Sequence, residues 1–297
     1  MLAESARTAS AAKPADASSS LRGIAAMVAG AGLLTLNDAV SKHLTEHYPI
    51  GQVVTLRQAA AMLFMVPYAL VLSGRAALVP VNVRGQFLRG LLFVLGTALV
   101  LTSLSLLPLS FVTVALFTSP LLVAVLSAPL LGERVHARQW IAVAAGLAGV
   151  LLIVRPTGAG FAWVMLLPFA SAITNACRDT YTRRLSRTDS SISVLFWSGV
   201  MVIVAGTCTL AFGWTAVDAS GAGWFLAAGF LNAAAHFMVI EAFRLGNAAT
   251  VAPFRYSGLL WAMILGYVLW REVPDVWMLS GAAIIVAAGV YMLRPGR

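Results

Sequence analysis

The sequence predicts an all-α polytopic membrane protein whose ten transmembrane helices form two inverted five-helix repeats. The first observation is composition: of 297 residues, 60% are hydrophobic and only 10% are charged. Soluble domains carry about 25% charged residues, so this chain has too few to cover a water-exposed surface. The second observation is a series of ten apolar runs, and the third is an internal repeat. Together they place the chain in a lipid bilayer.

The internal repeat relates the stretch from Arg89 to Pro156 to the stretch that begins 139 positions later. Glu133 then meets Glu272, and both copies end on an Arg-Pro pair. Further matched positions are Gly90 with Gly229, Leu126 with Leu265, and Phe117–Leu122 with Tyr256–Trp261. Because a repeat decides the architecture of a chain, we interpret residues 21–156 and 157–297 as two copies of one unit.

The apolar runs give the individual elements. Residues 1–20 are rich in Ala and Ser and contain no apolar run, so we expect a disordered cytoplasmic tail and no secretory signal there. Runs of about 17 to 25 residues are long enough to cross the hydrocarbon core as helices. Short connections between them predict antiparallel neighbours. The ten predicted spans are 22–41, 52–73, 87–107, 109–131, 137–154, 160–182, 192–213, 222–243, 248–270 and 274–293.

Basic residues predict the orientation. With a cytoplasmic N-terminus, fourteen of the 20 Lys and Arg residues lie in cytoplasmic segments, three lie within spans, and only Lys42, Arg155 and Arg271 lie outside. The positive-inside rule therefore predicts an inner (plasma) membrane protein with both termini in the cytoplasm. Because each copy has five spans, the second copy must be inverted relative to the first. This arrangement is typical of secondary transporters, whose site lies between the repeats.

Charged residues inside the spans mark a candidate site, because each charge at a helix centre costs about 2.5–3.5 kcal/mol on insertion scales. The first span ends in Asn37, Asp38 and Lys42. Asp38 and Lys42 are four residues apart, a spacing that allows an ion pair on one helix face. Arg57 lies about two turns into the second span, at a similar depth. We expect these residues to form a gate near the outer mouth; a purely structural ion pair is the alternative.

The sixth span carries a polar stripe near the opposite mouth, at positions i, i+4, i+7, i+8 and i+11. Its members are Ser171, Asn175, Arg178, Asp179 and Thr182. This stripe predicts a second gate at the cytoplasmic side.

The eighth and ninth spans add further polar groups. Asn232 and His236 lie one turn apart near the middle of the eighth span, and Glu241 lies towards its inner end. Arg255 and Tyr256 lie about 10 Å into the ninth span. We hypothesise that Arg255 and Glu241 join Arg178 and Asp179 in one ion-pair cluster at the cytoplasmic entrance. The structural alternative for His236 is a core histidine with satisfied hydrogen bonds. Glu133 and Glu272 lie at span ends, where we interpret them as caps or loop charges.

Proline and small residues divide the spans into two kinds. Pro120 in the fourth span and Pro253 in the ninth each remove a backbone hydrogen bond and predict a kink. The central parts of the fifth and tenth spans are rich in Ala and Gly and contain no charged residue, so we expect these spans to form a closely packed scaffold.

The sequence contains no motif that indicates catalysis or cofactor binding. His-Glu-x-x-His, Gly-x-Ser-x-Gly, a phosphate-binding Gly-rich loop and clustered metal ligands are all missing. We therefore expect no enzymatic activity, no cofactor and no metal. The net charge of +9 follows from the positive-inside pattern and gives no reason to expect a nucleic-acid partner.

Four short stretches resemble the EamA-domain members of the drug/metabolite transporter superfamily. They are Asn37-Asp38-Ala39 with Lys42, the span ends Leu131-Gly132-Glu133 and Trp270-Arg271-Glu272, and the run Ala252–Ser257. The resemblance covers nearly everything after residue 21. It implies two EamA repeats, a central cavity built from spans one to four and six to nine, and peripheral fifth and tenth spans. The Arg-Tyr run is similar to the subgroup that contains riboflavin and S-adenosylmethionine carriers.

The sequence as a whole predicts a secondary transporter of small polar organic metabolites, such as amino-acid, vitamin or nucleotide-like solutes. It would work by alternating access, driven by protons or by exchange. The expected partners are the substrate and the lipid bilayer, with a homodimer left open. The alternatives are a passive facilitator or channel and a membrane-embedded enzyme. The expected substrate-binding residues are Asn37, Arg57, Asn175, Asn232, His236, Arg255 and Tyr256, and the expected gate or coupling residues are Asp38, Lys42, Arg178, Asp179 and Glu241.

Overall fold

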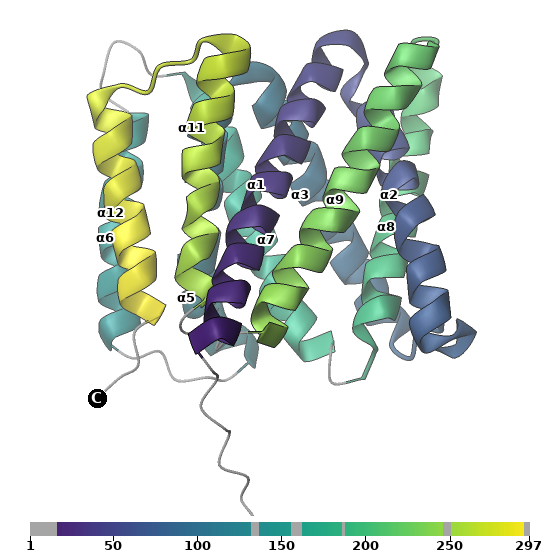
Figure 1. The fold of residues 1–297 in the computed structure, drawn as a ribbon, viewed down its shortest axis with the longest axis horizontal. Helices are drawn as coiled ribbons and strands as arrows, with labels where there is room; N and C mark the ends of the chain where they lie inside the picture. The colour runs from purple at the N-terminus through teal and green to yellow at the C-terminus, as the bar shows by residue number, and fades with distance from the viewer. Residues whose placement is uncertain (1–16, 132–136, 156–161, 186–187, 246–250, 294–297) are drawn as a thin grey trace, which may run out of the picture.

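The computed structural model describes residues 17–131, 137–155, 162–185, 188–245 and 251–293, and these residues form helices without β-strands (Figure 1). The first half contains α1 (Ala17–His47), α2 (Ile50–Ser73), the 3-10 helix η1 (Arg75–Leu78), α3 (Val83–Leu106), α4 (Leu109–Leu116), α5 (Ser119–Leu131) and α6 (Ala137–Val154). The second half contains η2 (Trp163–Leu166), α7 (Leu167–Leu185), α8 (Ser191–Thr207), η3 (Cys208–Phe212), α9 (Ala219–Leu245), η4 (Ala252–Tyr256), α11 (Ser257–Trp270) and α12 (Val276–Leu293). The prediction of an all-α bundle is confirmed.

Several helices have the length and composition of membrane spans. Within the described residues, five are long and apolar enough to cross a bilayer: Leu21–His47, Ile50–Pro67, Val83–Leu106, Ile192–Phe212 and Ala219–Ala242. Shorter apolar helices, such as Gln139–Val154 and Val276–Tyr291, stand beside them in the same bundle (Figure 1). The start of α1 differs from the expectation, because residues 17–20 are helical; residues 1–16 lie outside the described part.

The helices run alternately up and down in the bundle (Figure 1). We call the end at which α1 begins the lower end and the end at which α1 finishes the upper end. α12 finishes at the lower end, the same end at which α1 begins (Figure 1). Lys42, Arg155 and Arg271 all lie near the upper end, because α1, α6 and α11 terminate there. The structure thus gathers the three basic residues that the sequence separates from the others.

Two of the vertical helices are interrupted, and the two breaks are related by the repeat offset. α4 ends at Leu116 and α5 begins only at Ser119, whereas η4 ends at Tyr256 and α11 follows directly. The offset of 139 residues places Phe117 on Tyr256, so both interruptions fall at the same position of the repeat. Pro120 and Pro253 occupy the first turns of α5 and η4, where a missing N–H breaks no helical hydrogen bond.

The two helices expected to form the scaffold, α6 and α12, stand at one edge of the bundle (Figure 1). α6 and α12 pack against each other and stand at the left edge of the bundle in Figure 1. The central helices pair across the two halves: α1 packs against α9, and α3 packs against α7. The remaining large contacts include α2 with α8 and with α9, and α3 with α8.

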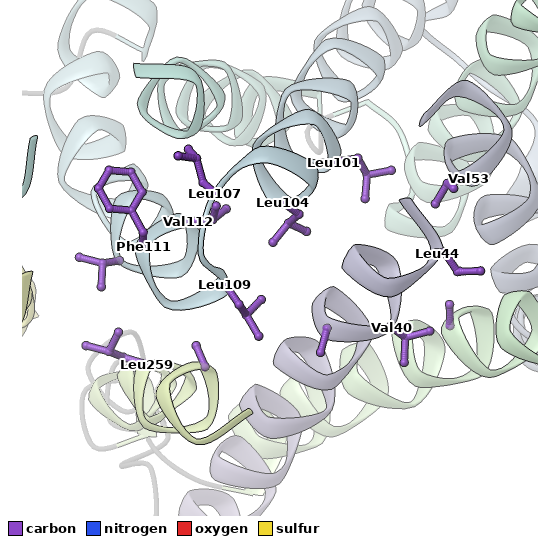
Figure 2. Packing of buried hydrophobic residues seen from close by; sticks show 14 of the residues in the cluster. Val40, Leu44, Val53, Leu101, Leu104, Leu107, Leu109, Phe111, Val112 and Leu259 are labelled. Atoms are coloured by element: carbon purple, nitrogen blue, oxygen red, sulfur yellow. The ribbon is translucent and has the colours of Figure 1, made fainter. Parts of the chain in front are cut away.

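The main hydrophobic core draws many of its residues from helix ends at the upper end of the bundle, and Figure 2 shows part of this core from close by. The end of α1, the start of α2, the end of α3 and the start of α4 contribute there, and α6, α8, α9, α11 and α12 add further residues. Buried members include Val40, Leu44, Val53, Leu101, Leu104, Leu107, Leu109, Phe111 and Val112. Close packing at this end leaves the free space of the bundle further down.

Candidate functional site

A cavity of about 500 Å³ lies between the two halves of the chain. Its walls come from α1, from α4 and α5 on both sides of their break, from α7, from η4 and the start of α11, and from α12. Its polar and aromatic lining residues are Thr35, Asp38, Thr113, Phe117, Ser119, Asn175, Arg178, Asp179, Arg255 and Tyr256. A volume in this range suits a metabolite-sized ligand.

The charges in the cavity are only partly paired. Asp179 Oδ1 accepts hydrogen bonds from Arg178 Nε at 2.9 Å and from Arg178 Nη2 at 2.7 Å, so these neighbouring charges neutralise each other. Asp38 and Arg255 form no ion pair within 4.0 Å with any residue that the structure describes. The cavity therefore presents one negative and one positive group that remain available to a ligand.

Asp38 also interacts with residues that do not line the cavity. Arg57 on α2 attracts the Asp38 carboxylate electrostatically and donates a hydrogen bond from Nη1 to Ser41 Oγ at 2.9 Å. Asn37 is buried and its Nδ2 donates to Asp38 Oδ1 over a long 3.5 Å. Arg57 and Asn37, both expected to bind substrate, thus interact with Asp38 and Ser41 and are absent from the lining of this cavity.

The two helix breaks place an aromatic pair in the wall of the cavity. Phe117 and Tyr256 meet edge to face, with ring centroids 5.0 Å apart and an interplanar angle of 63°. Gly289 on α12 leaves room for the tyrosine, because a Cβ at this position would overlap the Tyr256 hydroxyl. Aromatic pairs of this geometry are stabilising beyond their buried area. The Phe117–Tyr256 pair thus adds an aromatic surface to a cavity wall that also contains charged groups.

A buried ion pair between Lys42 and Glu272 lies on the upper side of the cavity. Lys42 Nζ also donates to the carbonyl of Leu107 at 3.1 Å, and Glu272 Oε2 accepts the N–H of Leu109 at 2.8 Å. The pair lies one helical turn above Asp38 on α1. The predicted Asp38–Lys42 pairing is therefore wrong: a partner 230 residues away replaces the neighbour four residues away.

The end of α11 explains how Glu272 reaches Lys42. Arg271 adopts a left-handed conformation (φ 56°, ψ 29°) that ends the helix, and the N–H of Glu272 then donates to the carbonyl of Gly266 at 3.1 Å. A Cβ on Gly266 would lie 2.7 Å from Glu272 Oε2, so only glycine leaves space for the folded-back carboxylate. The interpretation of Glu272 as a cap is confirmed in part, because it caps α4, but its ion pair was missed. Glu133, its repeat counterpart, lies outside the described residues.

The predicted cytoplasmic cluster is reduced to the Arg178–Asp179 pair. Glu241 instead pairs with Arg244 on the same helix, with 3.5 Å between Oε2 and Nη1. Asn232 and His236 on α9 are absent from the lining of the cavity, although His236 lies within electrostatic range of Arg255 and Arg178. These groups therefore have different neighbours and do not form one cluster.

A second buried network lies towards the lower end. Arg89 on α3 donates from Nε to Thr182 Oγ1 at 2.8 Å and also binds the carbonyl of Val194 and the hydroxyl of Ser198. Arg89 is one of the fourteen basic residues that the sequence assigns to cytoplasmic segments; it is buried and joins α3 to α7 and α8. The lowest member of the polar stripe, Thr182, thus serves helix packing.

The structure brings half of the expected site residues into the cavity wall. These are Asp38, Asn175, Arg178, Asp179, Arg255 and Tyr256; Asn37, Lys42, Arg57, Asn232, His236 and Glu241 lie elsewhere. Sequence reasoning missed Phe117, Ser119, Thr35 and Thr113 in the wall and Glu272 in the closure. The sequence repeat could have identified two of them: the offset of 139 residues matches Phe117 with Tyr256, which was expected in the site, and Glu272 with Glu133.

The fold and its cavity define a class: a multi-pass helical membrane protein with a ligand-sized space between its two halves. Comparison with known proteins then identifies the family. The EamA-like transporter family matches residues 21–155 and again residues 162–294, so the chain belongs to this family. Its relatives are transporters, not enzymes.

Three similar proteins illustrate the range of the family. The S-adenosylmethionine uptake transporter of Rickettsia bellii is 27% identical, with 86% of this chain and 88% of that protein covered. The riboflavin transporter of Rhizobium johnstonii is 28% identical, with 90% and 89% covered. The pseudopaline exporter CntI of Pseudomonas aeruginosa is 26% identical, with 92% and 96% covered. A protein solved by crystallography has the same fold, with a TM-score of 0.61 at 20% identity, covering 93% of this chain and 96% of that one.

Proposed function

We propose that the protein is a secondary carrier that moves small polar metabolites across the bacterial inner membrane by alternating access. The observation that carries this proposal is the charged cavity between the two halves, closed by Lys42 and Glu272 at the upper end. The wall reaches down to Arg255 and Asp179, which are both exposed. A carrier requires such a central site, accessible from one side at a time.

The packing of the helices supports two inverted repeats as the basis of this mechanism. If α1 corresponds to α7 and α3 to α9, the contact of α1 with α9 is equivalent to the contact of α7 with α3. The contacts of α1 with α11 and of α7 with α5 are related in the same way. The matching breaks at Phe117 and Tyr256, and the two separate matches to one family, agree with this pairing.

The basic residues support an orientation in which the lower end faces the cytoplasm. Lys42, Arg155 and Arg271 gather at the upper end, while most other basic residues belong to the opposite segments. In this orientation the structure represents a state that is closed to the outside and accessible from the cytoplasm. Rocking of one repeat against the other would break the Lys42–Glu272 pair and open the upper end.

The unpaired charges indicate the chemistry of the substrate. Arg255 offers a positive group to a carboxylate or phosphate, and Asp38 offers a negative group to an ammonium or another cation. The Phe117–Tyr256 pair adds an aromatic edge for a planar ring. We infer a ring-containing metabolite that carries both charges. S-adenosylmethionine, which the relative from Rickettsia bellii is named for, meets these requirements better than uncharged riboflavin.

Asp38 is the best candidate for coupling transport to protons. Of the three acidic residues considered from the sequence, Asp179 and Glu241 each share an ion pair with a neighbouring arginine. Asp38 faces the cavity without such a pair, so its protonation would change the charge that the substrate meets.

The test is uptake into proteoliposomes that contain the purified full-length chain. We expect saturable S-adenosylmethionine uptake, accelerated when the vesicles are preloaded with the same compound, and slower riboflavin uptake. Empty liposomes are the control. Uptake that rises linearly with concentration and is not accelerated by preloading would indicate a facilitator or channel. A chemically altered product inside the vesicles would indicate an enzyme.

A further inference from the structure

The upper end of α1 carries three metal-ligating side chains on one face. His43, Glu46 and His47 occupy positions i, i+3 and i+4, and their ligand atoms all lie within 4.8 Å of one another. The sequence reading found no clustered metal ligands, but this spacing of two histidines and a carboxylate forms a cluster as soon as the segment is helical. We propose that these residues bind a zinc-type divalent ion at the upper mouth of the carrier.

The hydrogen bonds of His47 leave the correct nitrogen available. His47 Nδ1 lies 3.1 Å from the carbonyl oxygen of His43, which can only accept a hydrogen bond. Nδ1 therefore carries the proton, and the lone pair of a neutral His47 ring lies on Nε2. A ligating histidine commonly donates its other ring N–H to a backbone carbonyl in this way, because the contact fixes the ring and its tautomer.

Glu46 and His43 are also held in place. Glu46 Oε1 accepts the indole N–H of Trp270 at 2.7 Å, while Oε2 lies 3.5 Å from His43 Nδ1. The His43 ring packs edge-on against Trp224, with centroids 5.2 Å apart. One carboxylate oxygen is thus anchored by α11, and the other faces the histidine. A metal ion between them would take Oε2 and leave the Trp270 hydrogen bond intact.

The donor set selects the class of ion. Two imidazole nitrogens and one carboxylate oxygen are ligands that Zn²⁺ and similar transition-metal ions prefer, whereas Mg²⁺ and Ca²⁺ prefer oxygen ligands alone. Three protein ligands leave a fourth position of a tetrahedral Zn²⁺ ion for water. The side chains of His43 and Glu46 are 40% and 43% exposed, so an ion can reach them from solution.

The site is connected to the upper closure of the cavity. The Trp270 ring that holds Glu46 also covers the Lys42 ammonium group, with Nζ 4.8 Å from the ring centroid. Lys42 in turn pairs with Glu272. An ion bound to Glu46 would fix Trp270 in the position that it occupies when the upper end is closed. The ion should therefore stabilise the closed upper end and slow transport, a consequence that rests on the proposed carrier function.

The binding experiment does not depend on transport. Purified full-length protein is titrated with Zn²⁺ by calorimetry and with Co²⁺ by visible absorption at pH 7.5, and Mg²⁺ is the negative control. We expect one saturable Zn²⁺ site, a tetrahedral Co²⁺ spectrum, and a Zn²⁺-dependent rise in Tm. His43→Ala and His47→Ala should each weaken binding at least about tenfold, a loss typical of a ligand whose removal costs about 1.4 kcal/mol or more.

His236→Ala is the matched control, because it removes a histidine far from the upper end and should keep full Zn²⁺ affinity. The Tm of each variant without metal verifies that it is folded. Equal Zn²⁺ binding by the wild type and the His43→Ala/His47→Ala double variant would overturn the site. If Zn²⁺ binds but does not change substrate uptake, the connection to the closure is wrong. If substrate uptake is missing altogether while Zn²⁺ still binds, the carrier function fails and the metal site stands.

Discussion

The two ends of the bundle are built differently, although the sequence repeat relates their elements. At the upper end much of the hydrophobic core is gathered, and the Lys42–Glu272 pair joins α1 to the end of α11. Further down lies the cavity, where Arg255 and Asp179 are exposed. A carrier that works by alternating access is built from equivalent repeats, but in any one state only one of its two ends is open. The difference between the two ends of this bundle agrees with one such state.

The upper end is held by an ion pair, and this affects how much free energy its opening would require. Burying two charges costs desolvation energy that largely offsets their attraction, so a buried ion pair adds little net stability. When the halves separate, water can solvate both Lys42 and Glu272 again. A closure made only of packed hydrophobic residues would instead expose apolar surface on opening, at about 25 cal/mol per Å². In the proposed alternating-access cycle, the ion pair would therefore hold this end closed without making its opening prohibitive.

The largest effect is expected from breaking one side of the upper closure. Glu272→Gln leaves the Lys42 charge buried without its partner, a change that costs about 3–5 kcal/mol in buried pairs. We expect a clear fall in the Tm of the purified protein. The Lys42→Met/Glu272→Gln double variant should recover most of the loss, because it removes both charges. A single variant as stable as the wild type would contradict this account of the upper end.

The next effect concerns the cavity. Arg255→Ala removes the unpaired positive group, and a charge-assisted hydrogen bond contributes about 1.5–3 kcal/mol. Substrate affinity should fall about 10- to 100-fold, with normal membrane insertion. Arg244→Ala is the matched control, since Arg244 is 77% exposed and pairs with Glu241 away from the cavity. Equal transport by the two variants would remove Arg255 from the site.

Asp38→Asn should separate coupling from binding. The amide keeps the size and the hydrogen-bonding oxygen of the side chain but can no longer take up a proton. Uptake driven by a pH gradient should be lost, while exchange of substrate across the membrane continues. Glu241→Gln should retain both activities. If Glu241→Gln loses the gradient-driven uptake and Asp38→Asn does not, the proton-coupling residue is Glu241 on α9 and not Asp38.

The lower end offers a carboxylate outside the spans whose stability contribution depends on pH. Burial by itself raises the pKa of Asp189, but hydrogen bonds from Gln86, Thr188 and the N–H groups of Val81 and Asn82 outweigh it and leave the pKa below the ordinary 3.8. Because the pKa of Asp189 is lower in the folded than in the unfolded protein, its ionised carboxylate stabilises the fold above pH 3.8. This contribution is lost as the pH falls through the pKa of Asp189 in the folded protein. Asp189→Asn should therefore lower Tm by an amount equivalent to about 1.5 kcal/mol at pH 7 and by much less near pH 3. A pH-independent difference would contradict this assignment.

The smallest effect is expected from the other ion pair of the upper end. Arg155 Nη2 lies 2.5 Å from Asp275 Oδ2, but the two side chains are 49% and 44% exposed. Pairs exposed to water contribute about 0–1 kcal/mol. Arg155→Ala should change Tm only slightly, and high salt should have a similarly small effect. A loss as large as that of Glu272→Gln would show that exposure does not distinguish the two pairs.

The sequence predicted the helical bundle well because length and hydropathy are sufficient to recognise a membrane span. It did not predict which face of a span meets the cavity. In a soluble helix the polar face marks water, but α9 is apolar nearly all round, so the orientation of Asn232 and His236 could not be read from periodicity. Local spacing also favoured Asp38 as the partner of Lys42, whereas the real partner lies in the other half. The repeat offset gave the long-range information that local spacing lacks, since it singled out Glu272 and matched Phe117 with Tyr256.

The most direct test of alternating access uses one cysteine in the wall of the cavity. Ser119→Cys is placed in a protein whose Cys177 and Cys208 are replaced by serine, and a membrane-impermeant maleimide is added to right-side-out or inside-out vesicles. The account predicts labelling from the cytoplasmic side at rest. It also predicts labelling from the outer side only when the Lys42–Glu272 pair is broken or transport is under way. Equal labelling from both sides of the resting protein would contradict it.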